Sequence, residues 1–150
     1  MMYTEIYFYS HHDPVYGCFS NFSPHDIIDD NSVIYPTSEH YFQAHKFTDY
    51  YYFNRVLEAK TPNKAAILGR NKNYPLRPDW EAVKNSVMYK ALELKFTQHP
   101  DISAVLLGTG DAVLIENTTN DYIWGCGTNK TGENRLGILL MELRKNLSRG

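Results

Sequence analysis

Apolar residues at spacings of three and four predict that the chain is mostly helical. The longest such pattern begins at residues 78–80 and ends near residues 99–100, where a proline stops it. Its apolar positions are Trp80, Val83, Val87, Ala91 and Leu94. Residues with this spacing share one side of a helix, so the sequence predicts that this helix lies at the centre of the core.

Four further helices are predicted from shorter patterns. Residues 50–60 and 61–69 form two of them, and the second begins with a cap followed by proline and ends at Gly69. We expect Asp101 to cap a third helix, which Gly108 closes. The fourth is amphipathic, with leucines at positions 136, 139, 140, 143 and 147 on one face.

A helix that begins at Thr37 or Ser38 carries the most suggestive chemistry. Pro36 cannot continue a helix backwards, and either hydroxyl can accept the first free N–H groups. Glu39 then lies in the first turn, where the helix dipole favours an ionised carboxylate. This position suits a general base, and it is equally typical of a well-capped structural helix.

Short strands and two loops complete the predicted fold. Residues 6–10 form a strand before a polar turn, residues 26–35 form a hairpin with an acidic turn, and residues 111–116 form a further strand. In the loop of residues 16–24, Phe19 and Phe22 either plug the core or hold a ring of a ligand. The polar loop of residues 120–133 is long enough to line a site. The expected fold class is α+β, mainly helical, with a few short strands.

Composition limits the architecture and the partners. The 150 residues, 43% of them hydrophobic, suffice for one core, so residues 1–150 are expected to form a single domain. The sequence shows neither an apolar run of roughly 20 residues nor a basic region followed by an apolar block at its start, so we expect a cytoplasmic protein without a membrane partner. Cys18 and Cys126 are expected to be reduced thiols. A formal charge of −2 argues against strong non-specific nucleic-acid binding.

Carboxylates amid aromatic residues are the main candidates for catalysis. Glu39, Gln43 and Lys46 are four and three residues apart, so they share one helical face, which is either reactive or a salt-bridged solvent face. Asp121, in the long loop beside Trp124, is the best second acid. Two acids around a sugar carbon are the usual requirement for cleaving a glycosidic bond, because one takes a proton from water and the other assists the leaving group.

Other common kinds of site, which bind phosphate, a dinucleotide or a metal, fit the residue spacing less well. The loop glycines lead into Glu133-Asn134, where a phosphate-binding loop needs lysine and a hydroxyl residue, and no third glycine completes a dinucleotide fingerprint. His40 and His45 are five residues apart and lie on different helix faces, so we expect no metal and no cofactor. A nucleophilic Cys126 stays an open alternative, although no histidine lies near it in sequence.

Six short blocks, in order along nearly the whole chain, carry a family resemblance. They are Tyr16-Gly17-x-Phe19-Ser20-Asn21-Phe22, Pro36-Thr37-Ser38-Glu39-His40-Tyr41-Phe42-Gln43-Ala44-x-Lys46-Phe47, Gly69-Arg70, Pro75-Leu76-Arg77-x-x-Trp80-Glu81, Asn120-Asp121-x-x-Trp124-Gly125 and Asn134-Arg135-Leu136-Gly137. With these blocks the sequence resembles the YbiA-like, or NADAR, family, named for its association with NAD and ADP-ribose. Cys126 departs from the pattern, since close relatives often have Asp there.

The resemblance implies a YbiA-like domain with N-glycosidase activity. One bacterial branch of the family hydrolyses the ribosyl-amine bond of phosphoribosylated pyrimidine intermediates of riboflavin synthesis, and other members remove ADP-ribose from guanine in nucleic acid. The implied partner is therefore a small-molecule ribosyl nucleotide or ADP-ribosylated guanine in nucleic acid. The alternative is a module that binds NAD or ADP-ribose without turnover.

Residue roles also follow from the resemblance. The catalytic positions carry over to Glu39, Lys46, Trp80 and Asp121, with Lys46 implied to engage the opened ribose covalently. That role needs a free amine, and hence a pKa lowered by burial or by a nearby cation. The implied substrate-binding residues are Asn21, Phe22, Arg70, Trp124, Asn134 and Arg135.

Overall fold

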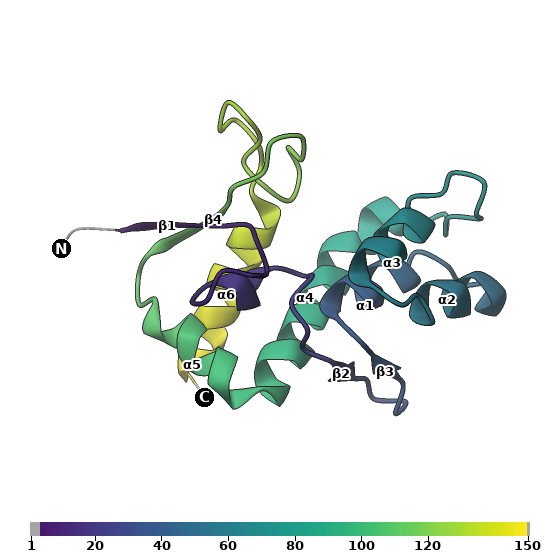
Figure 1. Cartoon of the computed structure of the whole chain (residues 1–150), viewed down its shortest axis with the longest axis horizontal. Helices are drawn as coiled ribbons and strands as arrows, with labels where there is room; N and C mark the ends of the chain where they lie inside the picture. Colours follow the sequence, from purple (N-terminus) through teal and green to yellow (C-terminus); the bar gives the residue numbers. More distant parts are fainter. Residues whose placement is uncertain (1–3, 150) are drawn as a thin grey trace. The chain divides into compact units, whose positions relative to one another are not determined.

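Helices dominate the computed structural model, which describes residues 4–149 and confirms the predicted class, α+β and mainly helical (Figure 1). Internal contacts divide the chain into two units. One is formed by residues 21–98, and the other by the described parts of residues 1–20 and 99–150. In the described part of the chain, no helix combines the length and the apolar character needed to cross a membrane.

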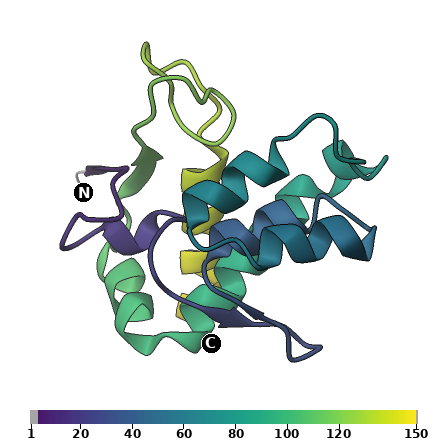
Figure 2. The ribbon, with the colours of Figure 1, turned by 45° about the vertical axis from the view of Figure 1, so that its right-hand side comes forward.

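The unit of residues 21–98 is built on four helices. The helices α1 (Ser38–Ala44), α2 (Tyr50–Leu57) and α3 (Pro62–Gly69) pack against one another, and α4 (Trp80–Gln98) packs against α1 (Figures 1 and 2). The predicted caps are confirmed, since Thr37 accepts the N–H of His40 and Thr61 accepts the N–H of Lys64. These local signals therefore set where α1 and α3 begin.

A two-stranded antiparallel hairpin precedes α1, as the sequence predicts. The strands are β2 (Ile27–Ile28) and β3 (Ile34–Tyr35). Asp29 forms the acidic turn, because its Oδ1 accepts the N–H groups of Asn31 and Val33, both at 2.9 Å. Ile27 and Tyr35 are buried, so the hairpin contributes its inner face to the core around α1.

The other unit joins the two ends of the chain. The strand β1 (Glu5–Phe8) pairs in parallel with β4 (Val113–Glu116), and α6 (Arg135–Arg149) packs against β4. The contact is close, since a Cβ at Gly137 would overlap the carbonyl oxygen of Leu114. The helix α5 (Pro100–Gly108) packs against α6, and a 3-10 turn (η1, Gly17–Phe19) follows β1.

Two predictions change in detail, and an alternative that the sequence left open is decided for Phe19. Asp101 does not cap α5: the N-cap is His99, with no side-chain hydrogen bond, and Asp101 lies within the first turn because the helix begins at Pro100. The helix expected over residues 50–60 ends earlier, at Leu57. Of the two loop phenylalanines, Phe19 is fully buried and its ring lies 5.5 Å from that of Phe8, so it belongs to the core, while Phe22 is half-buried.

Candidate active site

Glu39 sits in the first turn of α1 and is only 6% exposed. Its N–H donates to the backbone oxygen of Asn21 at 3.1 Å, and its Oε2 accepts Nε2 of Gln43 at 2.7 Å. Gln43 is 2% exposed, so this face of α1 is not a salt-bridged solvent face. Glu39 is a buried carboxylate fixed at both its backbone and its side chain.

Asn21 supports the start of α1 from the neighbouring loop. Its Oδ1 accepts the hydroxyl of Ser38 at 2.8 Å, and its Nδ2 lies 3.4 Å from Sδ of Met88. With its backbone oxygen on Glu39, the residue binds two successive positions of the helix. The structure thus gives Asn21 a positioning role behind the carboxylate.

Lys46 follows the end of α1 in a half-buried position. Its Nζ donates to the backbone oxygen of Gly69 at 3.3 Å and lies 5.9 Å from the ring centres of both Phe42 and Trp80. Burial lowers the pKa of Lys46 from 10.5 to about 8; Glu39 opposes this shift, and the cations Arg70 and Lys84 reinforce it. Roughly a tenth of this amine is therefore unprotonated at pH 7, and about half of it at pH 8.

A hollow of about 520 Å³ opens beside Lys46 within the unit of residues 21–98. Trp80 forms part of its wall, is 6% exposed, and meets the ring of Phe42 edge-on at 5.0 Å. Arg70 and Lys72 also line it and are exposed. The hollow thus combines an amine and an aromatic wall with cations suited to an anionic group.

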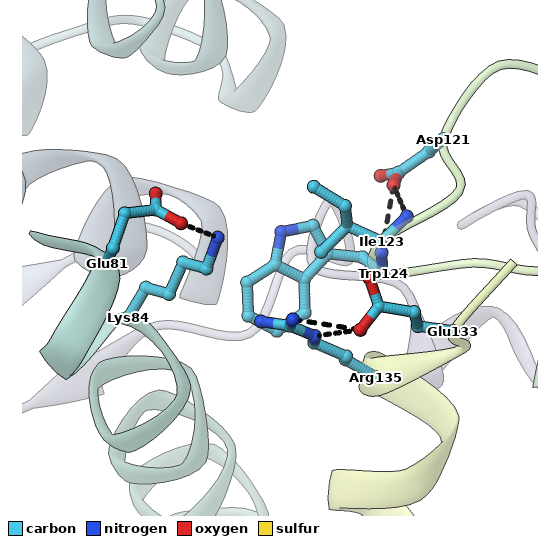
Figure 3. A network of polar contacts seen from close by, with 7 residues as sticks. All are labelled: Glu81, Lys84, Asp121, Ile123, Trp124, Glu133 and Arg135. Atoms are coloured by element: carbon cyan, nitrogen blue, oxygen red, sulfur yellow. Dashed lines mark hydrogen bonds and ion pairs between the residues drawn. The ribbon is translucent and has the colours of Figure 1, made fainter.

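Lys84 is a nearby cation that the sequence interpretation missed. It is 8% exposed, and its Nζ pairs with Glu81 at 2.7 Å (Figure 3). The signal was present, because Lys84 is four residues after Trp80 and so lies on the same side of α4. Arg77, by contrast, pairs with Asp79 at 2.6 Å, and its N–H donates to the oxygen of Lys46.

Asp121 belongs to the other unit, in the loop between β4 and α6. Its Oδ1 accepts the N–H groups of Ile123 at 3.0 Å and Trp124 at 2.8 Å (Figure 3). This arrangement is an Asx turn, which holds the carboxylate in one orientation. Asp121 stays half-exposed, so it combines a structural role with access to solvent.

The loop that carries Trp124 is folded onto the start of α6. The N–H groups of Arg135 and Leu136 donate to the backbone oxygens of Ile123 and Trp124, both at 3.0 Å. These contacts satisfy two of the free N–H groups of the helix. The hydrogen bond from α6 therefore fixes the backbone of Trp124, whose side chain is half-buried.

Asn134 and Arg135 both make contacts within their own unit. Asn134 Oδ1 accepts the N–H of Glu116 at 3.0 Å and its Nδ2 donates to the oxygen of Leu114 at 2.9 Å, so its side chain fastens β4. Arg135 pairs with Glu133 at 2.8 Å (Figure 3). Neither cysteine forms a disulfide, as predicted, and Cys126 is buried with its Sγ 3.4 Å from the oxygen of Gly127.

Together, these features define a mainly helical α+β protein in which Glu39, Lys46, Arg70 and Trp80 come together within residues 21–98. The model of the NADAR domain matches residues 7–148, so the chain belongs to the NADAR domain family, as its sequence motifs predict. The NMR structure of the protein YbiA of E. coli is similar along 99% of this chain and 87% of that one, with a TM-score of 0.90 and 50% identity.

Two sequence relatives extend the comparison. The protein named N-glycosidase YbiA of Shigella boydii is 52% identical over 145 residues, covering 97% of this chain and 89% of that protein. The riboflavin biosynthesis protein PYRR of Zea mays, which is chloroplastic, is 42% identical over 156 residues, covering 95% of this chain and 25% of that protein. A chain of this kind therefore occurs both alone and as part of a larger protein.

Proposed function

We propose that this protein hydrolyses the bond between ribose and the amino or base group of a phosphoribosylated or ADP-ribosylated compound, with Glu39, Lys46, Trp80 and Asp121 as its catalytic residues. The class of activity follows from relatives named N-glycosidase that share half of its positions: the chain is an N-glycosidase, a hydrolase of N-glycosyl bonds. This favours catalysis over a module that only binds NAD or ADP-ribose.

The observation that carries the residue assignment is the amine of Lys46, half-buried with a pKa lowered by burial to about 8 and coupled to the buried carboxylate of Glu39. Only an unprotonated amine is a nucleophile. Only an ionised carboxylate can take a proton from water. The two groups therefore supply both functions that hydrolysis at a sugar carbon needs.

A balanced route uses both groups. When the ribose ring opens, C1′ and the departing nitrogen form an imine, and Nζ of Lys46 adds to C1′. The C1′–N bond to the base then breaks, the base leaves with a proton, and C1′ stays bound to Lys46 as an imine. Water, deprotonated by Glu39, adds to C1′, and cleavage of the C1′–Nζ bond returns the amine and releases the sugar. Asp121 is proposed to donate the proton that the departing nitrogen takes up.

The charge of the hollow supports a phosphorylated substrate. Arg70 and Lys72 line it from an exposed position, and guanidinium groups bind phosphate with paired hydrogen bonds. Phe22 and Trp124 are proposed to stack against the base, and Asn134 and Arg135 to lie near the ribose or phosphate. The name of the maize relative supports a pyrimidine intermediate of riboflavin synthesis as the first candidate, with ADP-ribosylated guanine as the second.

We also propose that residues 1–150 form one YbiA-like, or NADAR, domain. Its support is the family match over residues 7–148, which includes residues from both units. Asp121 is proposed on this ground as a catalytic residue of the same domain.

The test is release of free base, followed by mass, from a phosphoribosylated aminopyrimidine and from ADP-ribosylated guanosine. We expect release from at least one, with Glu39→Gln slowing it by about 10²- to 10⁴-fold. Borohydride should trap the sugar on the wild-type protein and on Lys64→Met, an exposed control, but not on Lys46→Met. Binding of both compounds without release would favour the binding module instead.

A further inference from the structure

Gln43 lies between Glu39 and Lys46 in sequence, and its side chain is almost completely buried. Its Nε2 donates to Oε2 of Glu39 at 2.7 Å, whereas its Oε1 has no hydrogen-bond partner among residues 4–149. An unpaired buried oxygen destabilises a protein, and an apolar side chain of the same length would fill this space without one. The useful group is therefore the N–H that Gln43 directs at Glu39.

The space that Gln43 occupies depends on Gly69, the last residue of α3. A Cβ at Gly69 would overlap Oε1 of Gln43 and come within 2.8 Å of its Cδ. Gly69 is not among the glycines with positive φ, so it is not needed for a special backbone conformation. The helix α3 ends at Gly69, as the sequence predicts, and the absence of a side chain there also leaves room for Gln43.

Gly69 also contacts the second candidate catalytic group, because its backbone oxygen accepts Nζ of Lys46 at 3.3 Å. Gly69 thus contacts Lys46 directly, and it also contacts Gln43, whose side chain donates a hydrogen bond to Glu39. A shift of the end of α3 would move the supports of both groups together.

We propose that Gln43 is a positioning residue for the carboxylate of Glu39, and that Gly69 keeps Gln43 in place, so that the end of α3 sets the geometry of Glu39 and Lys46 together. An N–H donated to a carboxylate favours its ionised form, and this is the form that takes a proton from water. The kinetic part of this inference rests on the proposed function.

The kinetic test compares single and double variants in base release. Gln43→Met keeps the volume and removes the donor, so kcat should fall by about 10- to 100-fold while KM changes by less than about threefold. Gly69→Ala should give a similar loss by displacing Gln43. If both act through one contact, adding Gly69→Ala to Gln43→Ala should lower kcat little further, instead of multiplying the two losses.

The matched control is Gly108→Ala at the end of α5, where an added Cβ meets no atom within 4 Å. It should keep wild-type kcat. Unchanged kcat in Gln43→Met, or fully multiplicative losses in the double variant, would overturn the inference while leaving the proposed function intact.

A second measurement needs no turnover and only wild-type folding. The Nε2 protons of Gln43, observed by NMR in ¹⁵N-labelled protein, should shift as Glu39 ionises and lose this response in Glu39→Gln. The pKa of Lys46 is about 8, above the acidic range, whereas burial lowers the pKa of His40 and of His45 below 6.5. Loss of the acidic response in Glu39→Gln, with these histidines unchanged, therefore assigns the response to the carboxylate. Chemical shifts of the Nε2 protons that do not change with pH would refute the contact between Gln43 and Glu39. Absence of base release by the wild type would instead refute the proposed function alone.

Discussion

The backbone oxygen of Asn21 accepts the N–H of Glu39 at 3.1 Å, which ties the loop before the hairpin to the first turn of α1. The side chain of Asn21 reinforces this link by accepting the hydroxyl of Ser38 at 2.8 Å. The candidate general base is therefore positioned from outside its own helix. Substitutions in this loop should act on Glu39 without touching substrate.

Asn21→Ala should destabilise the protein by about 0.5–1.5 kcal/mol, because it removes the nearer acceptor of the buried Ser38 hydroxyl and leaves only the backbone oxygen of residue 21 at 3.4 Å. Urea unfolding measures the change. Asn31→Ala, in the exposed hairpin turn, is the control and should stay within about 0.5 kcal/mol of the wild type. Unchanged stability with weaker substrate binding would instead make Asn21 a substrate contact.

Lys46→Met should abolish base release and yet stabilise the protein at pH 7, by at most about 3 kcal/mol. Burial lowers the pKa of Lys46 from 10.5 to about 8 in the folded state, so below pH 8 the folded protein bears the full cost of a buried charge. Between pH 8 and 10.5 the unfolded state binds more protons, so wild-type stability rises with pH.

The measurement is urea unfolding of the wild type and Lys46→Met at pH 7 and pH 9.5. The difference should shrink at the higher pH. Lys64→Met, at an exposed lysine, should show no such pH dependence. A constant difference would mean that Lys46 keeps an ordinary pKa.

Base release by the wild type should rise with pH through about 8, because Lys46 acts as the free amine. The rate of base release, measured from pH 6 to 9 at saturating substrate, checks this. A rate that falls over the same range would assign Lys46 an electrostatic role as a cation.

Asp121→Asn and Asp121→Ala should separate the two roles of this carboxylate. Asn keeps the oxygen that accepts the N–H groups of Ile123 and Trp124, so its stability should stay within about 0.5 kcal/mol of the wild type, while Ala should lose about 1–2 kcal/mol. Both should lower kcat by about 10²-fold or more. Full activity in Asp121→Asn would confine Asp121 to the turn.

Asn134→Ala should destabilise β4, because it removes both side-chain hydrogen bonds to that strand. The φ of residue 134 is 53°, a backbone conformation that alanine adopts less readily than glycine. We expect a loss of about 2–3 kcal/mol and faster hydrogen exchange at the N–H of Glu116. Asn134→Gly loses the same bonds but relieves the backbone, so it should fall between Ala and the wild type. Equal exchange rates in all three would show that β4 does not depend on this side chain.

Local signals account for the parts of the fold that the sequence predicted. The caps Thr37 and Thr61, the acidic turn at Asp29 and the leucines of α6 act over a few residues, and these elements are confirmed. The family is confirmed because its motifs span the chain. Asp101 was misassigned because a proline at residue 100 can itself start the helix, one residue before the expected cap.

The support of the site was not predictable, because it depends on contacts between distant residues. The lowered pKa of Lys46 arises from burial and from Arg70 and Lys84, which are 24 and 38 positions away in sequence. The purpose of Gly69 depends on Gln43, on another helix. The spacing of Glu39, Gln43 and Lys46 predicted a shared face, but only packing decides whether that face meets solvent or the core.

The parallel pairing of β1 with β4 also bears on the order in which the chain can fold during synthesis. The partner of Glu5 is Val113, so β1 leaves the ribosome long before its partner exists and keeps an open edge until then. Residues 21–98 are continuous and can complete their contacts first. When synthesis has reached residue 98, the nascent chain therefore already contains Glu39, Gln43 and Lys46. The unit that carries Asp121 cannot form until later.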